Sequence, residues 1–197
     1  MSGLPLQPTG RPWPPQLQRW ALVLCLAIGV LVLGWVAPGR EPPPRVVLGG
    51  PGYELDYARE AQRLIDGAQR RIWLMMYVVR PDDGPVGSLL SALAAAKARG
   101  VDVRVCLDLG AVRDGEPDLK HEAAYAWLQG HGVAVILDEA GTTSHGKVLV
   151  ADSRRILSGS HNWTRSALTS NREASWLVDD PAIAARIEAW MSAIPGW

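Results

Sequence analysis

The period of hydrophobic and polar positions changes several times along the chain, and each change predicts an element. Short apolar runs predict strands at 46–48, 72–79, 103–107, 133–137, 147–150, 155–157 and 175–178. Apolar positions at helical spacing predict helices at 55–68, from Val86 to a stop at Gly100, at 121–129 and from Pro181 to about Met191. Asp180 can cap the last helix, and Pro181 suits its first turn. Strands alternating with helices predict an α/β sandwich, and the adjacent strands around 151–153 make its sheet mixed.

A different pattern precedes this domain, because residues 20–37 form an apolar run without a charged side chain. As a helix this run would be roughly 27 Å long, close to the hydrocarbon thickness of a bilayer. Trp20 and Trp35 stand near its two ends, where aromatic side chains meet the membrane interface. We therefore expect a retained transmembrane anchor. A cleaved signal peptide and a buried core helix are the alternatives, and Trp35 fits the small-residue pattern of a cleavage site poorly.

The predicted anchor divides the chain into four parts. They are a polar tail at 1–19, the membrane helix at 20–37, a proline-rich linker at 38–45 and a globular domain at 46–197. A proline-rich linker is stiff and extended, so it would hold the domain off the bilayer. Arg11, Arg19 and the amino terminus precede the apolar run, which slightly favours an N-terminus on the inside. We therefore expect a single-pass membrane protein with its globular domain on the outer or periplasmic side.

Charge and cysteine content narrow the function classes. All 20 acidic residues and 17 of the 20 basic residues lie from Glu41 onward, so this part carries a net charge near −3. It lacks the overall basic excess that marks many nucleic-acid-binding proteins. Cys25 and Cys106 lie in different predicted environments, so we expect no disulfide between them. No Cys or His cluster has metal-ligand spacing, and we expect neither a metal site nor a cofactor.

The segment 144–163 carries the candidate chemistry. Its pattern is H-x-K-x4-D-x6-G-S-x-N, formed by His145, Lys147, Asp152, Gly159, Ser160 and Asn162. His145 and Lys147 are two residues apart, so on a strand both side chains would lie on one face and could bind one phosphate. Near neutral pH an imidazole can act as a nucleophile or as an acid. Ser160 and Asn162 repeat the spacing and could donate hydrogen bonds to the same phosphate.

Two further residues complete the candidate site. Gly159 would let the backbone pass close to a ligand. Glu173 could hold the second imidazole nitrogen of His145 and so fix its tautomer and orientation. Each residue alone has an ordinary structural explanation, such as a surface histidine, a solvated lysine or a turn. Their occurrence together at fixed spacings favours a shared chemical role.

This pattern resembles the HKD signature of the phospholipase D superfamily, and Glu173 resembles the carboxylate that follows the signature. The resemblance covers mainly residues 144–178. It implies a phospholipase D-like sandwich and a two-step displacement through a phosphohistidine intermediate, without a metal ion. It also implies a structural role for Asp152, which lies between two predicted strands where a turn Asp can bond backbone amides.

The superfamily reaction uses two motifs, whereas this chain contains one. We therefore expect a homodimer in which two copies of His145 meet at the symmetry axis. The single motif resembles a branch that includes bacterial endonucleases and a mitochondrial outer-membrane member. The predicted function is a membrane-anchored phosphodiesterase, with a phospholipid headgroup favoured as substrate. A DNA or RNA endonuclease, a phosphatidyl transferase and a phosphodiester-binding module without turnover are the alternatives.

Overall fold

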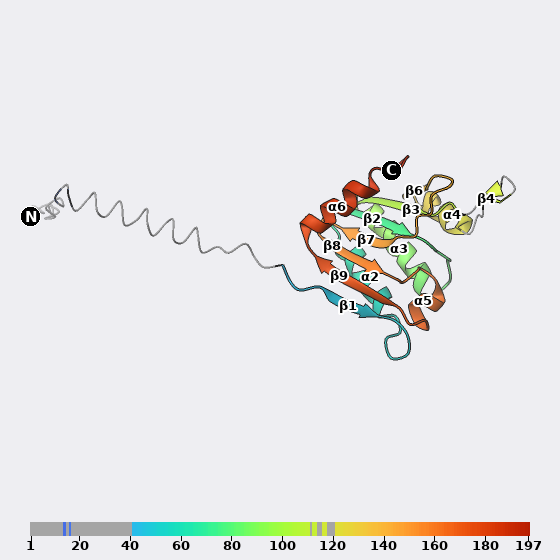
Figure 1. Cartoon of the computed structure of the whole chain (residues 1–197), viewed down its shortest axis with the longest axis horizontal. Coiled ribbons are helices and arrows are strands. Elements are labelled where there is room, and N and C mark those ends of the chain that lie inside the picture. The colour runs from blue at the N-terminus through green and yellow to red at the C-terminus, as the bar shows by residue number, and fades with distance from the viewer. Residues whose placement is uncertain (1–13, 15, 17–40, 111, 114–115, 118–120) are drawn as a thin grey trace, which may run out of the picture. The chain divides into compact units, whose positions relative to one another are not determined.

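A computed structural model describes residues 14, 16, 41–110, 112–113, 116–117 and 121–197. Residues Glu41–Trp197 form one unit. Its main feature is a seven-stranded sheet with helices on both faces (Figure 1).

The seven strands form a mixed sheet. Their bounds are β1 Arg45–Leu48, β2 Arg71–Met76, β3 Asp102–Leu107, β6 Ala134–Leu137, β7 Lys147–Ala151, β8 Arg155–Gly159 and β9 Ala174–Asp179. The order across the sheet is β1-β9-β8-β7-β2-β3-β6. β2, β3 and β6 pair in parallel, and every pair from β2 through β7, β8 and β9 to β1 is antiparallel. A separate short pair joins β4 Val112–Arg113 to β5 Glu116–Pro117. The predicted mixed α/β sandwich is confirmed.

Helices cover the two faces unequally. Their bounds are α2 Asp56–Gly67, α3 Pro85–Ala98, α4 Glu122–Gly130, α5 Arg165–Thr169 and α6 Pro181–Met191. Side chains of α2, α3, α4 and α5 bury one face of the sheet in a large apolar core. α6 covers the other face, where Ala184 and Met191 pack with Trp73 and Val148 (Figure 1). Burial of these apolar side chains supplies most of the stabilisation of both layers.

Most element bounds lie within a few residues of those expected. α6 begins as predicted, because the Asp180 carboxylate accepts hydrogen bonds from the backbone N–H groups of Ala182 at 2.7 Å and Ile183 at 3.0 Å. β2 ends at Met76, earlier than predicted, since Val79 instead makes an isolated bridge to Trp163. α5, β4 and β5 were not predicted, because elements of two to five residues are too short to show a hydrophobic period.

The predicted location in a membrane requires correction. No helix within the described part of the chain is long and apolar enough to cross a bilayer. The run at 20–37 that was predicted to be the anchor lies outside the described residues. The described unit starts at Glu41, and its first strand begins at Arg45, inside the stretch predicted as linker.

Candidate active site

One edge of the sheet collects one end of each of the seven strands. β1, β2, β3, β6 and β8 end there and β7 and β9 begin there, as the strand registers require. We call it the motif edge, defined by Met76, Leu107, Leu137, Lys147, Gly159 and Ala174. The other end of the same strands is the opposite edge, defined by Arg71, Asp102, Ala151, Arg155 and Asp179. The predicted site residues other than Asp152 come to the motif edge, although they are far apart along the chain.

His145 and Lys147 lie side by side at this edge. Lys147 is the first residue of β7 and pairs with Met76 of β2, while His145 lies in the loop just before the strand. The Lys147 ammonium Nζ is 3.4 Å from each ring nitrogen of His145 and donates a hydrogen bond to the His145 carbonyl at 2.8 Å. The lysine side chain is only 7% exposed, whereas His145 is exposed. A fixed positive charge therefore lies beside an imidazole that solvent can reach.

Tyr77 is a member of this cluster that the sequence did not indicate. It directly follows β2, and its ring centroid is 4.2 Å from that of His145. The Lys147 ammonium lies 4.6 Å from the centre of the same ring, within cation–π range. The aromatic ring thus packs against both members of the pair and limits the rotamers that they can adopt.

Ser160 and Glu173 form a second polar group at the motif edge. The Ser160 hydroxyl donates to a Glu173 carboxylate oxygen and accepts from the backbone N–H of Ala174 at 3.0 Å. The other carboxylate oxygen of Glu173 accepts from the Asn171 side-chain amide at 3.2 Å. These are the hydrogen bonds that the Glu173 carboxylate makes with described residues. The predicted contact with the His145 imidazole is therefore not made within one chain.

Gly159 is required by strand packing, a reason that the sequence did not indicate. A Cβ atom at this position would lie 2.3 Å from the carbonyl oxygen of Ala174 and 2.4 Å from Cα of Ser175. Both atoms belong to the backbone of β9, which cannot move aside without breaking its pairing with β8. Glycine therefore permits close strand packing here, and the predicted close approach of a ligand stays a prediction.

Asn162 and His161 complete the loop that follows β8. The side-chain Oδ1 of Asn162 is buried and accepts no hydrogen bond from the described residues. His161 is buried, stacks on Tyr57 with ring centroids 4.4 Å apart, and has its Nδ1 2.8 Å from the Ser175 hydroxyl. Burial lowers the pKa of the His161 imidazole to about 4, although the Glu173 carboxylate opposes this shift. His161 is thus a neutral, buried histidine at ordinary pH.

Asp152 lies at the opposite edge, at the turn between β7 and β8. Its carboxylate accepts hydrogen bonds from the backbone N–H groups of Gln69, Arg70 and Arg71 at 2.8–3.2 Å. Burial alone would raise the pKa of this carboxyl, but hydrogen bonds from Arg70, Gln69 and Arg71 outweigh burial and lower it. Asp152 joins the hairpin to the start of β2 and lies at the far end of β7 from His145.

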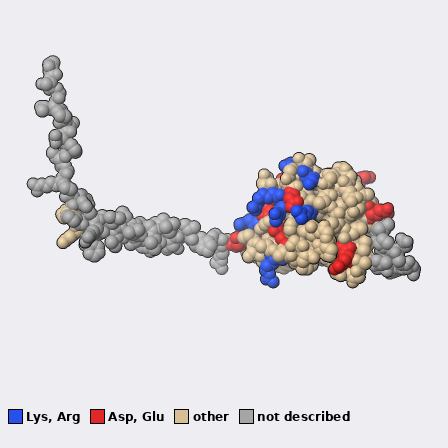
Figure 2. All heavy atoms as spheres, turned by 90° about the horizontal axis from the view of Figure 1, so that it is seen from above, with Lys and Arg blue, Asp and Glu red and all other residues tan. Residues whose placement is uncertain are grey.

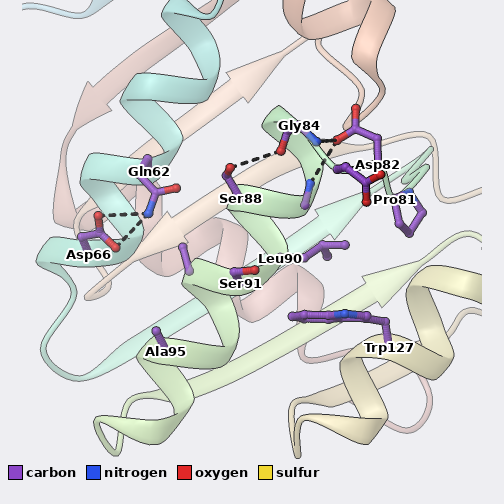
Figure 3. A pocket seen from close by; sticks show the side chains of 13 residues that line it. Gln62, Asp66, Pro81, Asp82, Gly84, Ser88, Leu90, Ser91, Ala95 and Trp127 are labelled. Atoms are coloured by element: carbon purple, nitrogen blue, oxygen red, sulfur yellow. Dashed lines mark hydrogen bonds between the residues drawn. The ribbon is translucent and has the colours of Figure 1, made fainter.

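The hollow shown in Figure 3 is not part of this cluster. It has a volume of about 1070 Å³ and lies among α2, α3, α4 and the 81–84 segment. Trp127 forms one side of it, and Asp82 accepts hydrogen bonds from the backbone N–H groups at the start of α3. None of the signature residues lines it. The motif edge, and not this hollow, holds the candidate chemistry.

The motif edge offers a nucleophilic imidazole, a fixed ammonium and neutral hydrogen-bonding groups. Such a set suits a substrate with a negatively charged, tetrahedral centre, because the ammonium can bind its oxygens while the imidazole attacks. Among residues 41–110 and 121–197, no three His, Cys, Asp or Glu side chains are grouped so that they could hold a metal ion.

Comparison with known proteins identifies relatives of the chain. Residues 62–195 match the family described as "Cardiolipin synthase, PLD-like domain". A phospholipase D of Rickettsia conorii is 30% identical over 130 residues, which are 65% of this chain and 59% of that protein. A mitochondrial cardiolipin hydrolase of Xenopus laevis is 32% identical over 117 residues, 59% of this chain and 50% of that protein. The chain thus spans about half to three fifths of the length of these curated relatives.

A solved structure adds a likeness in fold. Nuc, a phospholipase D family member from Salmonella typhimurium, superimposes with a TM-score of 0.60 at 27% identity. The superposition covers 76% of this chain and 93% of that one. Because the family match alone spans well over half of the 197 residues, the chain belongs to the phospholipase D superfamily of phosphodiesterases.

Proposed function

We propose that the domain hydrolyses a phosphodiester through a covalent intermediate on His145, in an active site completed by a second copy of the chain. The observation that carries this proposal is the pairing of an exposed imidazole with a buried ammonium 3.4 Å away at the motif edge. The ammonium is held in place by the His145 carbonyl and the Tyr77 ring. It is therefore ready to bind the non-bridging oxygens of a phosphate without reorganising.

In the first step a ring nitrogen of neutral His145 attacks the phosphorus atom. A P–N bond forms and the P–O bond to the leaving alcohol breaks, while a protonated second imidazole gives its proton to the departing oxygen. In the second step this imidazole takes a proton from water as the water oxygen attacks phosphorus. The P–N bond then breaks and restores His145. The products are an alcohol and a phosphomonoester, and Lys147 neutralises the developing charge throughout.

The second imidazole is proposed to come from a second copy of the chain. The other histidines of the domain are engaged elsewhere: His121 and His161 are 2% and 1% exposed, and His131 follows α4, with its ring on Trp127. A two-fold axis beside His145 would bring two copies of the motif edge together. In this arrangement Glu173, which does not reach its own His145, acts in the shared site together with Ser160 and Asn162 as the second group of polar side chains.

A phospholipid headgroup diester is the favoured substrate. Relatives of the chain carry the names phospholipase D and mitochondrial cardiolipin hydrolase, and the domain lacks a basic excess that would favour a polyanion. On the face seen in Figure 2, Lys and Arg side chains lie intermixed with Asp and Glu side chains and form no continuous basic track. A nucleic-acid diester is the second candidate, favoured by the resemblance to the single-motif branch of the superfamily.

Three substrates test this function in order of increasing specificity. The purified protein should hydrolyse bis(p-nitrophenyl) phosphate, and should convert labelled cardiolipin in vesicles to phosphatidic acid and phosphatidylglycerol faster than it cleaves labelled single-stranded DNA. The reverse preference would assign the nucleic-acid function. Retention of either ligand without product would identify a binding module and contradict the proposal. Trapping of ³²P on the wild-type protein, but not on His145→Ala, would show the covalent intermediate.

The shared site has its own test, which uses mixed dimers. A dimer of one wild-type chain and one His145→Ala chain should retain little activity, because each reaction needs both imidazoles. Half of the wild-type rate per dimer would show that the two sites are independent and would contradict the shared site.

A further inference from the structure

Two buried carboxylates at the motif edge bond to the backbone of the residue that precedes His145. They take no part in the proposed hydrolysis steps. Asp108 follows the last residue of β3, and Asp138 follows the last residue of β6. Leu107 and Leu137 are register partners in these parallel strands, so the two carboxylates emerge side by side. They are only 2% and 6% exposed.

Both carboxylates accept a hydrogen bond from the same backbone group. The N–H of Ser144 lies 3.0 Å from Oδ1 of Asp108 and 2.9 Å from Oδ2 of Asp138. Asp138 is itself fixed to the end of β3, because its Oδ1 accepts from the N–H of Leu109 and its own N–H donates to the Leu107 carbonyl. Burying two carboxylates costs free energy unless they accept hydrogen bonds. The Ser144 N–H donates to both, so both carboxylates hold the backbone at Ser144.

Ser144 immediately precedes the proposed nucleophile. The N–H of His145 donates to the Thr143 carbonyl at 3.0 Å, and the His145 carbonyl accepts from Lys147 Nζ. The peptide groups on both sides of His145 are thus fixed, and its side chain keeps only its own torsions. We propose that Asp108 and Asp138 are positioning residues that act through the Ser144 N–H to hold the His145 imidazole at attack distance from phosphorus. This proposal rests on the function proposed above.

We call Asp108 and Asp138, with the Ser144 N–H that they share, the carboxylate clamp. Unlike the two buried carboxylates, the loop that joins Asp138 to Ser144 is open to solvent. Residues 139–143 are all exposed, and Gly141 has a positive φ of 90°. The hydrogen bond from the Ser144 N–H to Asp138 closes the base of this loop, and the Thr143 carbonyl at its end accepts from the N–H of His145. Cys106 is a buried residue close to Asp108, Asp138 and Ser144. Burial raises the pKa of its thiol to about 12, with the Asp138 and Asp108 carboxylates adding to the shift and the Ser144 hydroxyl opposing it, so it stays protonated.

Steady-state kinetics of Asp108 and Asp138 variants test whether the two carboxylates position His145. In the full chain, Asp138→Ala and Asp108→Ala should each lower kcat for bis(p-nitrophenyl) phosphate by about 10- to 100-fold, because small misplacements of a reacting group are costly. KM should change less than about threefold, since Lys147 and the other phosphate-binding groups stay in place. The matched control is Asp102→Asn, which alters a carboxylate at the opposite end of β3 and should leave kcat within about twofold.

A readout of imidazole position separates positioning from stability. In protein labelled with ¹⁵N-histidine, the His145 ring signals, assigned by their loss in His145→Ala, should shift or split in the Asp138→Ala and Asp108→Ala proteins. They should be unchanged in Asp102→Asn. Folded Asp138→Ala and Asp108→Ala proteins with wild-type kcat and wild-type His145 signals would overturn the proposal. A kcat loss that merely follows the unfolded fraction, with unchanged ring signals, would overturn it as well.

A conservative variant covers the case in which the alanine variants do not fold. Asp138→Glu keeps the charge and the acceptor but moves them by one methylene, so the fold should survive while kcat falls about tenfold and the His145 signals shift. Wild-type values for both would overturn the proposal. If the wild-type protein hydrolyses no diester, the proposed function fails, whereas the ring signals still decide whether the two carboxylates position His145.

Discussion

The two edges of the sheet use similar residues in opposite ways. At the opposite edge Arg71 pairs with Glu188 at 3.5 Å and Arg104 with Asp102 at 3.2 Å, while Asp152 is saturated by backbone N–H groups. The charged side chains there are paired with opposite charges or with backbone N–H groups. At the motif edge, the His145 imidazole is exposed beside the Lys147 ammonium, and no carboxylate among the described residues bonds to its ring nitrogens. The first arrangement stabilises the fold, and the second leaves groups available to a substrate.

The H-x-K-x4-D signature runs from one of these edges to the other. β7 spans Lys147–Ala151, so its start carries the histidine and lysine while the turn after its end carries Asp152. A single strand thus separates the proposed catalytic part of the motif from its structural part. Substitutions at its two ends should therefore affect different measurements, and the following experiments test this separation from the largest expected effect to the smallest.

Replacement of His145 by Ala should cause the largest loss. We expect turnover to fall by at least roughly 10³-fold, because no other described side chain replaces the nucleophile. The free energy of unfolding should change by less than about 0.5 kcal/mol, since the side chain is exposed. Steady-state kinetics and urea denaturation measure the two quantities. Unchanged turnover would reject the mechanism.

Replacement of Asp152 by Ala should show the opposite behaviour. Loss of the hydrogen bonds to Gln69, Arg70 and Arg71 should lower the free energy of unfolding by roughly 3 kcal/mol at pH 7. The pKa of this carboxyl is lowered in the folded state, so its contribution is complete above the ordinary pKa of 3.8 and is lost as pH falls through the folded-state pKa. The difference from wild type should therefore shrink in acid. A loss of kcat in the folded variant would break the separation of the two edges.

His161 should make the motif edge sensitive to acid. Its folded-state pKa is lowered from the ordinary 6.5 to about 4, so the unfolded chain takes up a proton at a higher pH than the folded one. Stability should be complete above about pH 6.5 and fall by about 2 kcal/mol between pH 6.5 and pH 4. His161→Phe keeps the stacking on Tyr57 and should remove this dependence. Urea denaturation at several pH values in that range measures the free energy of unfolding. If it changed equally with pH in both proteins, the assignment to His161 would be contradicted.

The smallest effect is expected from an ion pair at the opposite edge. Arg104→Gln breaks a contact with Asp102 in which both side chains are about 40% exposed. Exposed pairs contribute little, so the free energy of unfolding should fall by less than about 1 kcal/mol and kcat should not change. Thermal denaturation of both proteins in low and high salt measures the contribution of this ion pair to stability. A large loss of activity would show that the opposite edge takes part in catalysis.

Local patterns made the elements and the signature predictable. Asp180 and Pro181 fix the start of α6 through contacts within three residues, which spacing alone reveals. The apolar run of β2 is buried on both faces and reads as a strand without further information. In the same way, the fixed distance from His145 to Lys147 along a nearly extended chain predicts that their side chains adjoin.

Contacts between segments far apart in the sequence could not be predicted from local patterns. Tyr77 reaches the site because β2 pairs with β7, and Asp108 and Asp138 meet because β3 pairs with β6. One available signal was an acidic residue directly after each of two buried parallel strands, which places both at the same edge. The packing requirement at Gly159 was not predicted, because the sequence does not show how closely the backbone of β9 approaches this residue.

The exposed loop at 139–143 provides a place to attach a probe. Because Thr142 is exposed and the hydrogen bond between Ser144 and Asp138 closes the base of the loop, a cysteine at this position should accept a spin label. Cys106 is buried and its thiol stays protonated, so with Cys25 replaced by Ser the label should react selectively at the loop. Pulsed electron resonance between two labelled chains would then measure how far apart their loops lie when substrate is bound.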